Sequence, residues 1–271
     1  MPHKPIFEMP LQSRTVHDLA TLYNYADLCY KITSMHTYSC GKGDTERTYT
    51  AKGTAGNEAK LADNLTRARS RVQELALCNS WEWFATLTLD KEKYDRHNLP
   101  KFNKDLGQFI RDFRKQHGCA VKYLLIPEKH KDGAWHMHGF FMGLPVEHLR
   151  EFRLTDRLPH KIRARIEDGK HVYTWDAYAR RFGFADIEPI DNHEAAGNYI
   201  IKYITKDTTR SITKLNAHIY YASKHLEGRK VVYRDLLDRP LTEPDYSNDY
   251  CTVKWFDDAE QAMACFEEVS T

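Results

Sequence analysis

The chain has 271 residues and a formal net charge of +2, with 41% hydrophobic and 12% aromatic residues. This length and apolar content suffice for a folded core, so the composition excludes a wholly disordered protein. The six cysteines include no Cys-x-x-Cys pair, which excludes a structural zinc finger or a thioredoxin-like motif. No stretch approaches about 18 consecutive apolar residues, so we expect a cytoplasmic protein with reduced thiols and no membrane partner.

The first 56 residues are predicted to form an N-terminal arm. A short helix is expected around residues 16–32, and residues 38–56 are rich in Gly, Thr, Ser and charge, as loops are. Apolar residues at helical spacing then predict a helix over residues 57–78. Arginines on this helix suit either a solvated face or a DNA-binding stripe, and Arg67 and Arg71 are the candidate DNA contacts.

The centre of the chain alternates between strand and helix patterns. In chain order we predict strands over 83–90, 119–127, 135–143 and 184–190, helices over 99–117, 146–153, 173–182 and 192–206, and a strand pair within 215–236. The order strand–helix–strand–strand–helix–strand is that of a ferredoxin-like split βαβ fold. We therefore predict an α+β domain over residues 57–236, with a central antiparallel sheet flanked by helices, and an acidic C-terminal extension over 237–271. Because this fold supports many functions, it carries no functional argument.

A His-x-His pattern lies in the third expected strand. Successive side chains of a strand point to opposite faces, so His136 and His138 project from one face and Met137 from the other. Glu128 lies across the expected hairpin from His136, and residues opposite each other are about 5 Å apart. Two imidazoles and a carboxylate suit Mn²⁺, Mg²⁺ or Zn²⁺, and His130 is a spare candidate ligand. Histidines that only pack or form hydrogen bonds within the sheet are the alternative.

A pattern of tyrosine and lysine follows in the last central helix. On a helix Tyr199, Lys202, Tyr203 and Lys206 share one arc of about 100°, while the intervening isoleucines face the other side. A tyrosine oxygen can attack a phosphodiester to form a phosphotyrosine, and a nearby ammonium group favours the phenolate. Two tyrosines one turn apart allow two successive strand transfers. Aromatic residues that only pack the helix are the alternative.

A basic run lies between the His-x-His motif and the tyrosine helix. It places Lys161, Arg163 and Arg165 within six residues, where they are candidate contacts to DNA phosphates. A solvated basic surface explains the same run equally well.

Taken together, the motifs resemble those of the HUH endonuclease superfamily, in which U stands for a hydrophobic residue. Residues 84–90 (Phe-Ala-Thr-Leu-Thr-Leu-Asp) look like its first motif, Glu128 with His136-Met-His138 like its second, and residues 199–206 like its third. The doubled Tyr-x-x-Lys is most similar to the two-tyrosine rolling-circle replication initiators (Rep proteins) of phages and plasmids. Relaxases usually place their tyrosine before the His motif, which is not the order here.

This resemblance implies a metal-dependent enzyme of a bacterial host's cytoplasm. It would nick and rejoin single-stranded or hairpin origin DNA through a 5′-phosphotyrosine, with Mn²⁺ or Mg²⁺ at the His and Glu residues. The chain has no Gly-x-x-x-x-Gly-Lys-[Ser/Thr] motif, so a host helicase and a host polymerase are the expected partners. An HUH-type transposase, a non-catalytic single-stranded DNA-binding module and a water-using phosphoesterase remain alternatives.

Overall fold

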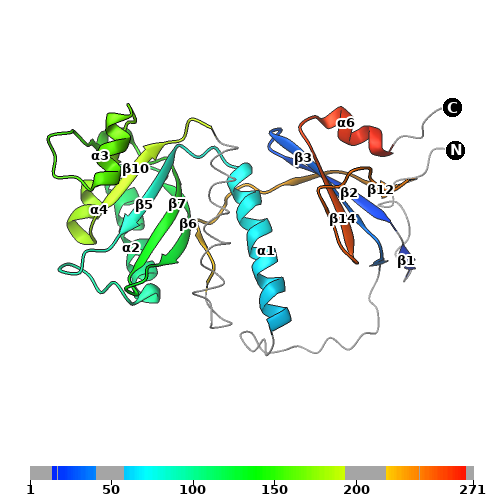
Figure 1. Ribbon diagram of the computed structural model, residues 1–271, viewed down its shortest axis with the longest axis horizontal. Helices are drawn as coiled ribbons and strands as arrows, with labels where there is room; N and C mark the ends of the chain where they lie inside the picture. The colour runs from blue at the N-terminus through cyan, green and yellow to red at the C-terminus, as the bar shows by residue number, and fades with distance from the viewer. Residues whose placement is uncertain (1–13, 17, 41–57, 193–217, 238, 267–271) are drawn as a thin grey trace. The chain divides into compact units, whose positions relative to one another are not determined.

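The structure, a computed structural model, describes residues 14–16, 18–40, 58–192, 218–237 and 239–266 (Figure 1). It is an α+β protein that divides into two compact units. One unit comprises Thr50–Leu226, and the other combines the two terminal segments, Met1–Tyr49 and Glu227–Thr271. Within the described residues, no helix is both long enough and apolar enough to cross a membrane.

The Thr50–Leu226 unit is built on a seven-stranded antiparallel sheet with the order β11-β6-β7-β5-β10-β9-β8. Its strands are β5 (Trp83–Thr88), β6 (Lys122–Lys129), β7 (Trp135–Met142), β8 (Arg150–Glu151), β9 (Tyr173–Thr174), β10 (Ala185–Pro189) and β11 (Tyr221–Ala222). Strands β6 and β7 form a hairpin and pair along their full length. Because β5 and β10 follow on the other side of β7, the hairpin and two strands from other parts of the sequence lie side by side.

Helices pack on both sides of this sheet. They are α1 (Glu58–Leu77), α2 (Leu99–His117), α3 (His160–Glu167) and α4 (Asp176–Arg181), with a short 3-10 turn, η2 (Val146–His148). Helix α2 begins at Asn98, whose side chain accepts a hydrogen bond from the backbone N–H of Lys101 at 3.1 Å. It ends at Gly118, whose φ of 63° is the left-handed conformation that favours glycine. The residues Asn98 and Gly118 therefore determine where α2 begins and ends.

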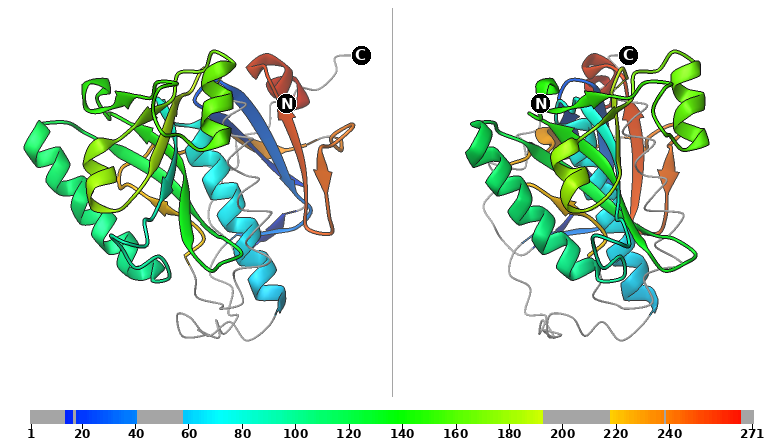
Figure 2. Two further views of the ribbon diagram at one scale, coloured as in Figure 1. Left: turned by 60° about the vertical axis from the view of Figure 1, so that its left-hand side comes forward. Right: turned by 90° about the vertical axis from the view of Figure 1, so that its left-hand side faces the viewer.

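The two faces of the sheet bury different sets of side chains, and α1 and α2 lie on opposite sides of it (Figure 2). On the α2 face, Leu87 and Met137 are fully buried under aromatic residues of α2 and α4. On the other face, Leu124, Ile126 and Phe140 pack against α1. The sheet is thus a central layer with a core on each side.

At Gly139 the backbone of β6 passes close to β7. A Cβ atom added to Gly139 would lie 2.0 Å from the carbonyl oxygen of Leu124, a separation that no side chain tolerates. Gly139 pairs with Leu125 on β6 and with Ala85 on β5. Glycine at this point therefore allows the strand that carries both histidines to fit between its neighbours.

The second unit contains a five-stranded antiparallel sheet of order β12-β2-β3-β14-β13. Its elements are β2 (Leu19–Tyr25), β3 (Cys29–Met35), β12 (Lys230–Leu236), β13 (Tyr246–Ser247), β14 (Cys251–Phe256), α6 (Ala259–Met263) and η3 (Ala264–Phe266), and β1 (Arg14–Val16) pairs separately with β4 (Tyr38–Cys40). Ala20, Leu22 and Ile32 form a core with Phe256 and Ala262. Strands from both ends of the sequence therefore complete one sheet.

Most elements predicted for the centre are confirmed. The four predicted strands correspond to β5, β6, β7 and β10, and the helices predicted over 57–78 and 99–117 correspond to α1 and α2. The helix predicted over 173–182 is shorter, since α4 begins at Asp176 and is preceded by β9. The helix predicted over 192–206 lies outside the described residues.

Three predictions about secondary structure are wrong. Residues 16–32 form β2 and β3 instead of a helix, because Ala26 and Asp27 adopt φ values of 56° and 59° and turn the chain into a hairpin. Residues 146–153 hold only η2 and β8. The strands expected to pair within 215–236 instead join different sheets, because β11 pairs with β6 and β12 pairs with β2. The predicted boundaries of an arm (1–56), a nicking domain (57–236) and an extension (237–271) remain a prediction.

Candidate functional site

The two histidines of β7 lie on the α1 face of the sheet. Strand alternation places His136 and His138 on the face opposite Met137, which is buried under α2. Their rings are nearly parallel, with centroids 6.5 Å apart and an interplanar angle of 9°. His138 is buried and His136 is half-buried. The strand backbone thus places two imidazole rings side by side, and both are at least partly buried.

Each histidine is held by a threonine of β5. The register pairs Thr86 with His138 and Thr88 with His136. Thr86 Oγ1 lies 3.3 Å from Nδ1 of His138, and Thr88 Oγ1 lies 3.0 Å from Nδ1 of His136. Since both rings use Nδ1 toward threonine, both leave Nε2 for another partner. The sequence signal for this role is the Thr-x-Thr spacing of Thr86 and Thr88 on one strand.

Glu128 joins the same cluster from β6. The register places it opposite His136, as the hairpin predicted. Its carboxylate, however, contacts the other histidine, with Oε2 of Glu128 at 2.5 Å from Nε2 of His138. A nitrogen and an oxygen this close need a proton between them, because two lone pairs repel. The contact therefore occupies the two atoms that would both coordinate a cation.

His136 is held in its neutral form. Burial lowers its pKa to about 4, and the neighbouring His130 and His138 contribute to the decrease, while Glu128 and Asp132 oppose it. The His130 ring stacks on the His136 ring with centroids 3.7 Å apart and an interplanar angle of 11°. A neutral imidazole with its Nδ1 engaged is the form that ligates a metal ion.

The chemistry of these residues fits a divalent metal, although their present arrangement is not a coordination sphere. Glu128, His136 and His138 supply one oxygen and two nitrogen donors, a set that suits Mn²⁺ or Zn²⁺ and, with more oxygen from water or phosphate, Mg²⁺. Across the described parts of the chain, no three His, Cys, Asp or Glu side chains converge closely enough to hold an ion. A cation here would replace the proton that Glu128 and His138 share.

A second carboxylate lies on the same face, one strand beyond the threonines. Asp186 of β10 pairs in register with Thr86, so both side chains point to the same face of the sheet. Burial raises the pKa of Asp186, while Arg165 and the charge of His138 oppose this increase. Arg165 of α3 lies 3.6 Å from Oδ1 of Asp186 and also contacts Glu188. Sequence reading missed Asp186 because nothing near it in the chain resembles a motif.

The other predicted DNA contacts fall into two groups. Arg67 and Lys161 are exposed on α1 and α3. Arg71 is also exposed but forms an ion pair with Glu74 at 2.5 Å. Arg163 donates hydrogen bonds to the carbonyl groups of Leu154 and Asp156, and Arg165 is paired as described above. Arg163 and Arg165 thus have structural roles that leave less of their charge available to DNA.

The predicted catalytic residues of the tyrosine motif, Tyr199, Lys202, Tyr203 and Lys206, lie outside the described residues. The structure therefore gives no geometry between them and the histidines, and their role remains a prediction.

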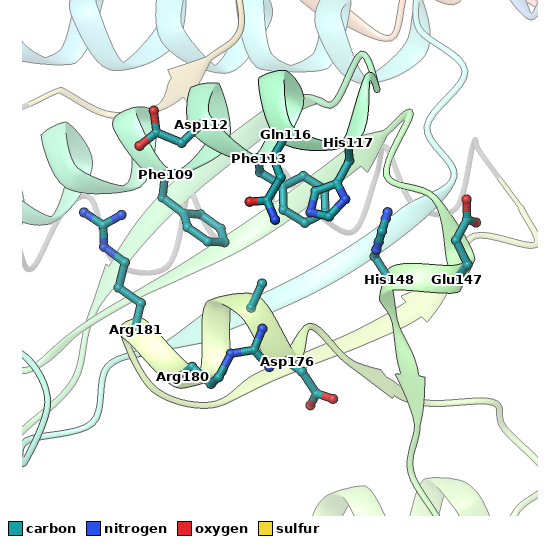
Figure 3. A pocket seen from close by; sticks show the side chains of 11 residues that line it. Phe109, Asp112, Phe113, Gln116, His117, Glu147, His148, Asp176, Arg180 and Arg181 are labelled. Atoms are coloured by element: carbon teal, nitrogen blue, oxygen red, sulfur yellow. The ribbon is translucent and has the colours of Figure 1, made fainter.

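A cavity of about 510 Å³ lies elsewhere in the unit, between α2, η2 and α4 (Figure 3). His117 and His148 face each other on its wall with ring centroids 4.1 Å apart (Figure 3). Its lining mixes both charges, with Arg180 and Arg181 alongside three carboxylates. Because α2 covers the face opposite His136 and His138, this cavity is separate from the polar cluster.

Comparison with known families identifies the segment that carries the cluster. Residues 82–208 match the family model Replication-associated protein ORF2/G2P. The ORF2/G2P match covers a little less than half of the chain and contains β5, β6, β7 and β10, together with residues 199–206. Searches of curated proteins and of solved structures found no match. The similarity to ORF2/G2P proteins is thus confined to the part of the chain that holds the candidate site.

Proposed function

We propose that this protein initiates rolling-circle replication by nicking and rejoining single-stranded origin DNA through a 5′-phosphotyrosine. The observation that carries the proposal is the cluster of Glu128, His136 and His138, which folding assembles within the segment similar to replication-associated ORF2/G2P proteins. The name of this family concerns replication, which favours an initiator over an HUH-type transposase.

The strand order supports the ferredoxin-like arrangement that this function needs. The four strands of the pattern lie in the order β6-β7-β5-β10, all antiparallel, with α2 between β5 and β6 in sequence and α4 before β10. This is how a split βαβ sandwich is built. The HUH strand is then the central β7, where both neighbours can add side chains to its polar face.

His136, His138 and Glu128 would hold the metal, Mn²⁺ or Mg²⁺. When bound, such an ion polarises a phosphate oxygen and offsets the charge that develops during phosphoryl transfer. Thr86 and Thr88 fix the imidazole rings so that each presents Nε2. The burial that keeps His136 neutral leaves its nitrogen available near neutral pH.

Tyr199 and Tyr203 supply the proposed nucleophiles. The phenol oxygen of one tyrosine forms a bond to the scissile phosphorus, and the bond from phosphorus to the 3′ oxygen breaks, so that oxygen takes up a proton and leaves as a 3′ hydroxyl. Lys202 and Lys206 favour the phenolate and stabilise charge on the phosphoryl group. The second tyrosine supports a second transfer, and the reverse reaction with a 3′ hydroxyl rejoins the strand.

The partners follow from this chemistry. The substrate is single-stranded or hairpin origin DNA, and the free 3′ hydroxyl is a primer for a host polymerase. Because the sequence contains no P-loop motif, a host helicase is the proposed source of unwinding. A non-catalytic DNA-binding module is the second candidate, favoured only by the exposed basic residues Arg67 and Lys161.

A covalent-adduct assay tests the proposal. The protein is incubated with Mn²⁺ and labelled single-stranded DNA from its own replicon, and the products are separated on a denaturing gel. We expect a DNA–protein adduct with the wild type, none with Tyr199→Phe/Tyr203→Phe, and a normal yield with the control Tyr220→Phe/Tyr221→Phe. Cleaved DNA without an adduct would indicate a water-using phosphoesterase. Binding without cleavage on a verified origin would indicate the non-catalytic module.

A further inference from the structure

One face of the five-stranded sheet in the second unit is rich in aromatic and basic side chains. Ile32 of β3 and Phe256 of β14 belong to the core that packs on α6. Strand alternation directs the residues before them, Lys31 and Trp255, to the opposite face of the sheet. The register places Tyr23 of β2 beside Lys31 and Trp255 beyond it, so the three side chains form a row across three strands. We call this side of the sheet the aromatic face.

Cations lie against the rings of this row. Lys31 Nζ lies 5.0 Å from the centroid of the Trp255 ring and 5.6 Å from that of Tyr25, within the range of a cation–π interaction. The guanidinium carbon of Arg229 lies 4.0 Å from the centroid of the Tyr23 ring, and Arg229 donates a hydrogen bond to the Tyr25 hydroxyl at 3.0 Å. Because the Tyr25 and Trp255 rings are also in contact, with centroids 5.0 Å apart, these five residues are connected, and we call them the aromatic array.

The aromatic face is partly open to solvent and basic. Tyr25 is buried, whereas Tyr23, Lys31 and Trp255 are only half-buried. Arg234 of β12 adds another cation, and its Nε donates a hydrogen bond to Thr21 Oγ1 at 2.9 Å. Of the residues that the described strands of this sheet direct to the aromatic face, none is Asp or Glu. The strands therefore give this face a charge that attracts an anion.

The combination of rings and cations matches single-stranded nucleic acid. Bases of a single strand stack on aromatic side chains and guanidinium planes, while basic side chains attract the phosphates. A duplex would offer its phosphates but not its base faces to such a surface. A protein partner that binds through apolar contacts would need a continuous apolar surface, and Lys31 and Arg229 interrupt the apolar surface here.

We propose that the aromatic array is a second binding surface for single-stranded DNA. Tyr23 and Trp255 stack on bases, and Lys31 and Arg229 attract the phosphates. Binding is tolerant of sequence, because every base has a face that can stack. The inference goes beyond the proposed function, since the unit that holds the array contains neither the candidate metal ligands nor the tyrosine motif.

Binding measured without cleavage tests the inference. Full-length protein is titrated in EDTA into a labelled oligothymidylate of about 16 nucleotides, and fluorescence anisotropy gives the affinity. We expect Trp255→Leu to bind it about five-fold or more weakly, and Trp255→Phe, which keeps an aromatic ring, to stay within about three-fold of the wild type. Lys31→Gln should reduce the slope of log affinity against log salt by about 0.7.

Two matched changes away from the array serve as controls. Lys254 lies next to Trp255 on β14, but it pairs with Ile32 and so points to the α6 face. We expect Lys254→Gln to keep the wild-type salt slope. Tyr250→Leu removes an aromatic ring that is 73% exposed and lies outside the array, and its affinity should stay within about two-fold of the wild type. The comparison separates the aromatic face from a general loss of charge or of a ring.

Photocrosslinking locates the bound strand. An oligothymidylate that carries 5-iododeoxyuridine is irradiated with the wild type, and the crosslinked peptides are identified by mass spectrometry. We expect peptides that contain Tyr23 or Trp255. If Trp255→Leu fails to fold, Lys31→Gln and the crosslinks decide.

The outcomes are distinct from those of the adduct assay. Wild-type affinity in Trp255→Leu together with a wild-type salt slope in Lys31→Gln would overturn the inference. Crosslinks confined to the Thr50–Leu226 unit, or a duplex of equal length that binds as tightly as the single strand, would also overturn it. A wild type that forms no adduct, but whose Trp255→Leu variant binds the single strand more weakly, would refute the proposed nicking function and leave the role of the array standing.

Discussion

The two faces of the seven-stranded sheet use the same strands for opposite purposes. Toward α2, Leu87 and Met137 are fully buried in a core rich in aromatic rings. Toward α1, Thr86, His136 and His138 come from the same two strands at alternate positions. Part of that second face is apolar and packs on α1, and the remainder is the polar cluster.

A regular strand with one buried face supplies a rigid support for polar side chains on its other face. Packing of the apolar face holds the backbone of β5 and β7 in place. The polar residues that alternate with the core positions are therefore held rigidly too. Strand alternation thus places the core residues and the proposed metal ligands one residue apart in sequence. Substitutions on one face should affect stability, and those on the other should affect chemistry.

Loss of a core side chain should give the largest change. Met137→Ala removes a fully buried side chain between the two histidines, and we expect the free energy of unfolding to fall by about 2–5 kcal/mol. Urea unfolding followed by circular dichroism measures this. The folded fraction should still form the DNA adduct within a few-fold of the wild-type yield, and a stable but inactive variant would break the proposed separation of the faces.

The reciprocal change tests the polar face. His138→Gln should lower the rate of Mn²⁺-dependent adduct formation by about 100-fold or more, equivalent to about 2.7 kcal/mol, because a donor of the proposed metal site is lost. Its urea midpoint should stay close to that of the wild type. The control His171→Gln changes an exposed histidine and should keep full activity. Equal losses in the two variants would show that the cluster has no special role.

The pH dependence of stability should come from the polar face. His136 has a folded pKa of about 4 against an ordinary value of 6.5, so between these values the unfolded chain binds more protons. The stabilisation linked to a neutral His136 is complete above pH 6.5 and is lost as the pH falls toward 4. We expect His136→Gln to flatten the rise in unfolding free energy of the metal-free protein over this window. An unchanged slope would contradict the burial-driven shift.

The smallest effect is expected at the exposed basic residues. Lys161 is exposed on α3, whereas Arg165 on the same helix is paired with Asp186 and Glu188. If Lys161 contacts a phosphate, Lys161→Ala should reduce the slope of log affinity against log salt by about 0.7 for single-stranded DNA. Fluorescence anisotropy over a salt series measures the slope. No change would remove Lys161 from the DNA-binding surface.

Sequence reading succeeded where the pattern is local. The His136 and His138 spacing, the apolar stripe of α2 and the β6–β7 hairpin each depend on residues close together in the chain. Asp186 was not predicted because only the order of strands in the sheet brings it near the site. It lies on β10, the strand next to β5, and no local sequence pattern marks its position. The contact of Glu128 with His138 rather than with its register partner His136 was likewise not predictable from spacing.

The secondary structure of the terminal segments was also harder to predict from the sequence, because it too depends on residues far apart in the chain. A helix was predicted over 16–32, but this segment forms the β2–β3 hairpin, whose turn contains no glycine and in which Ala26 and Asp27 adopt left-handed φ values. Strand β12 pairs with β2, more than 200 residues earlier in the chain, so neither end of the sequence reveals the sheet by itself. Long-range pairing decides these elements, and local propensity does not encode it.

The central claim is that the polar face, through His136 and His138, holds the metal ion that supports DNA cleavage. Pulsed electron paramagnetic resonance of the Mn²⁺-loaded protein, with and without ¹⁵N-labelled histidine, tests it most directly. We predict histidine nitrogen couplings to Mn²⁺ that persist in the control His117→Gln/His148→Gln, from the cavity beyond α2, and vanish in His136→Gln/His138→Gln. A protein that forms the DNA adduct with Mn²⁺ but shows no histidine coupling would contradict the account.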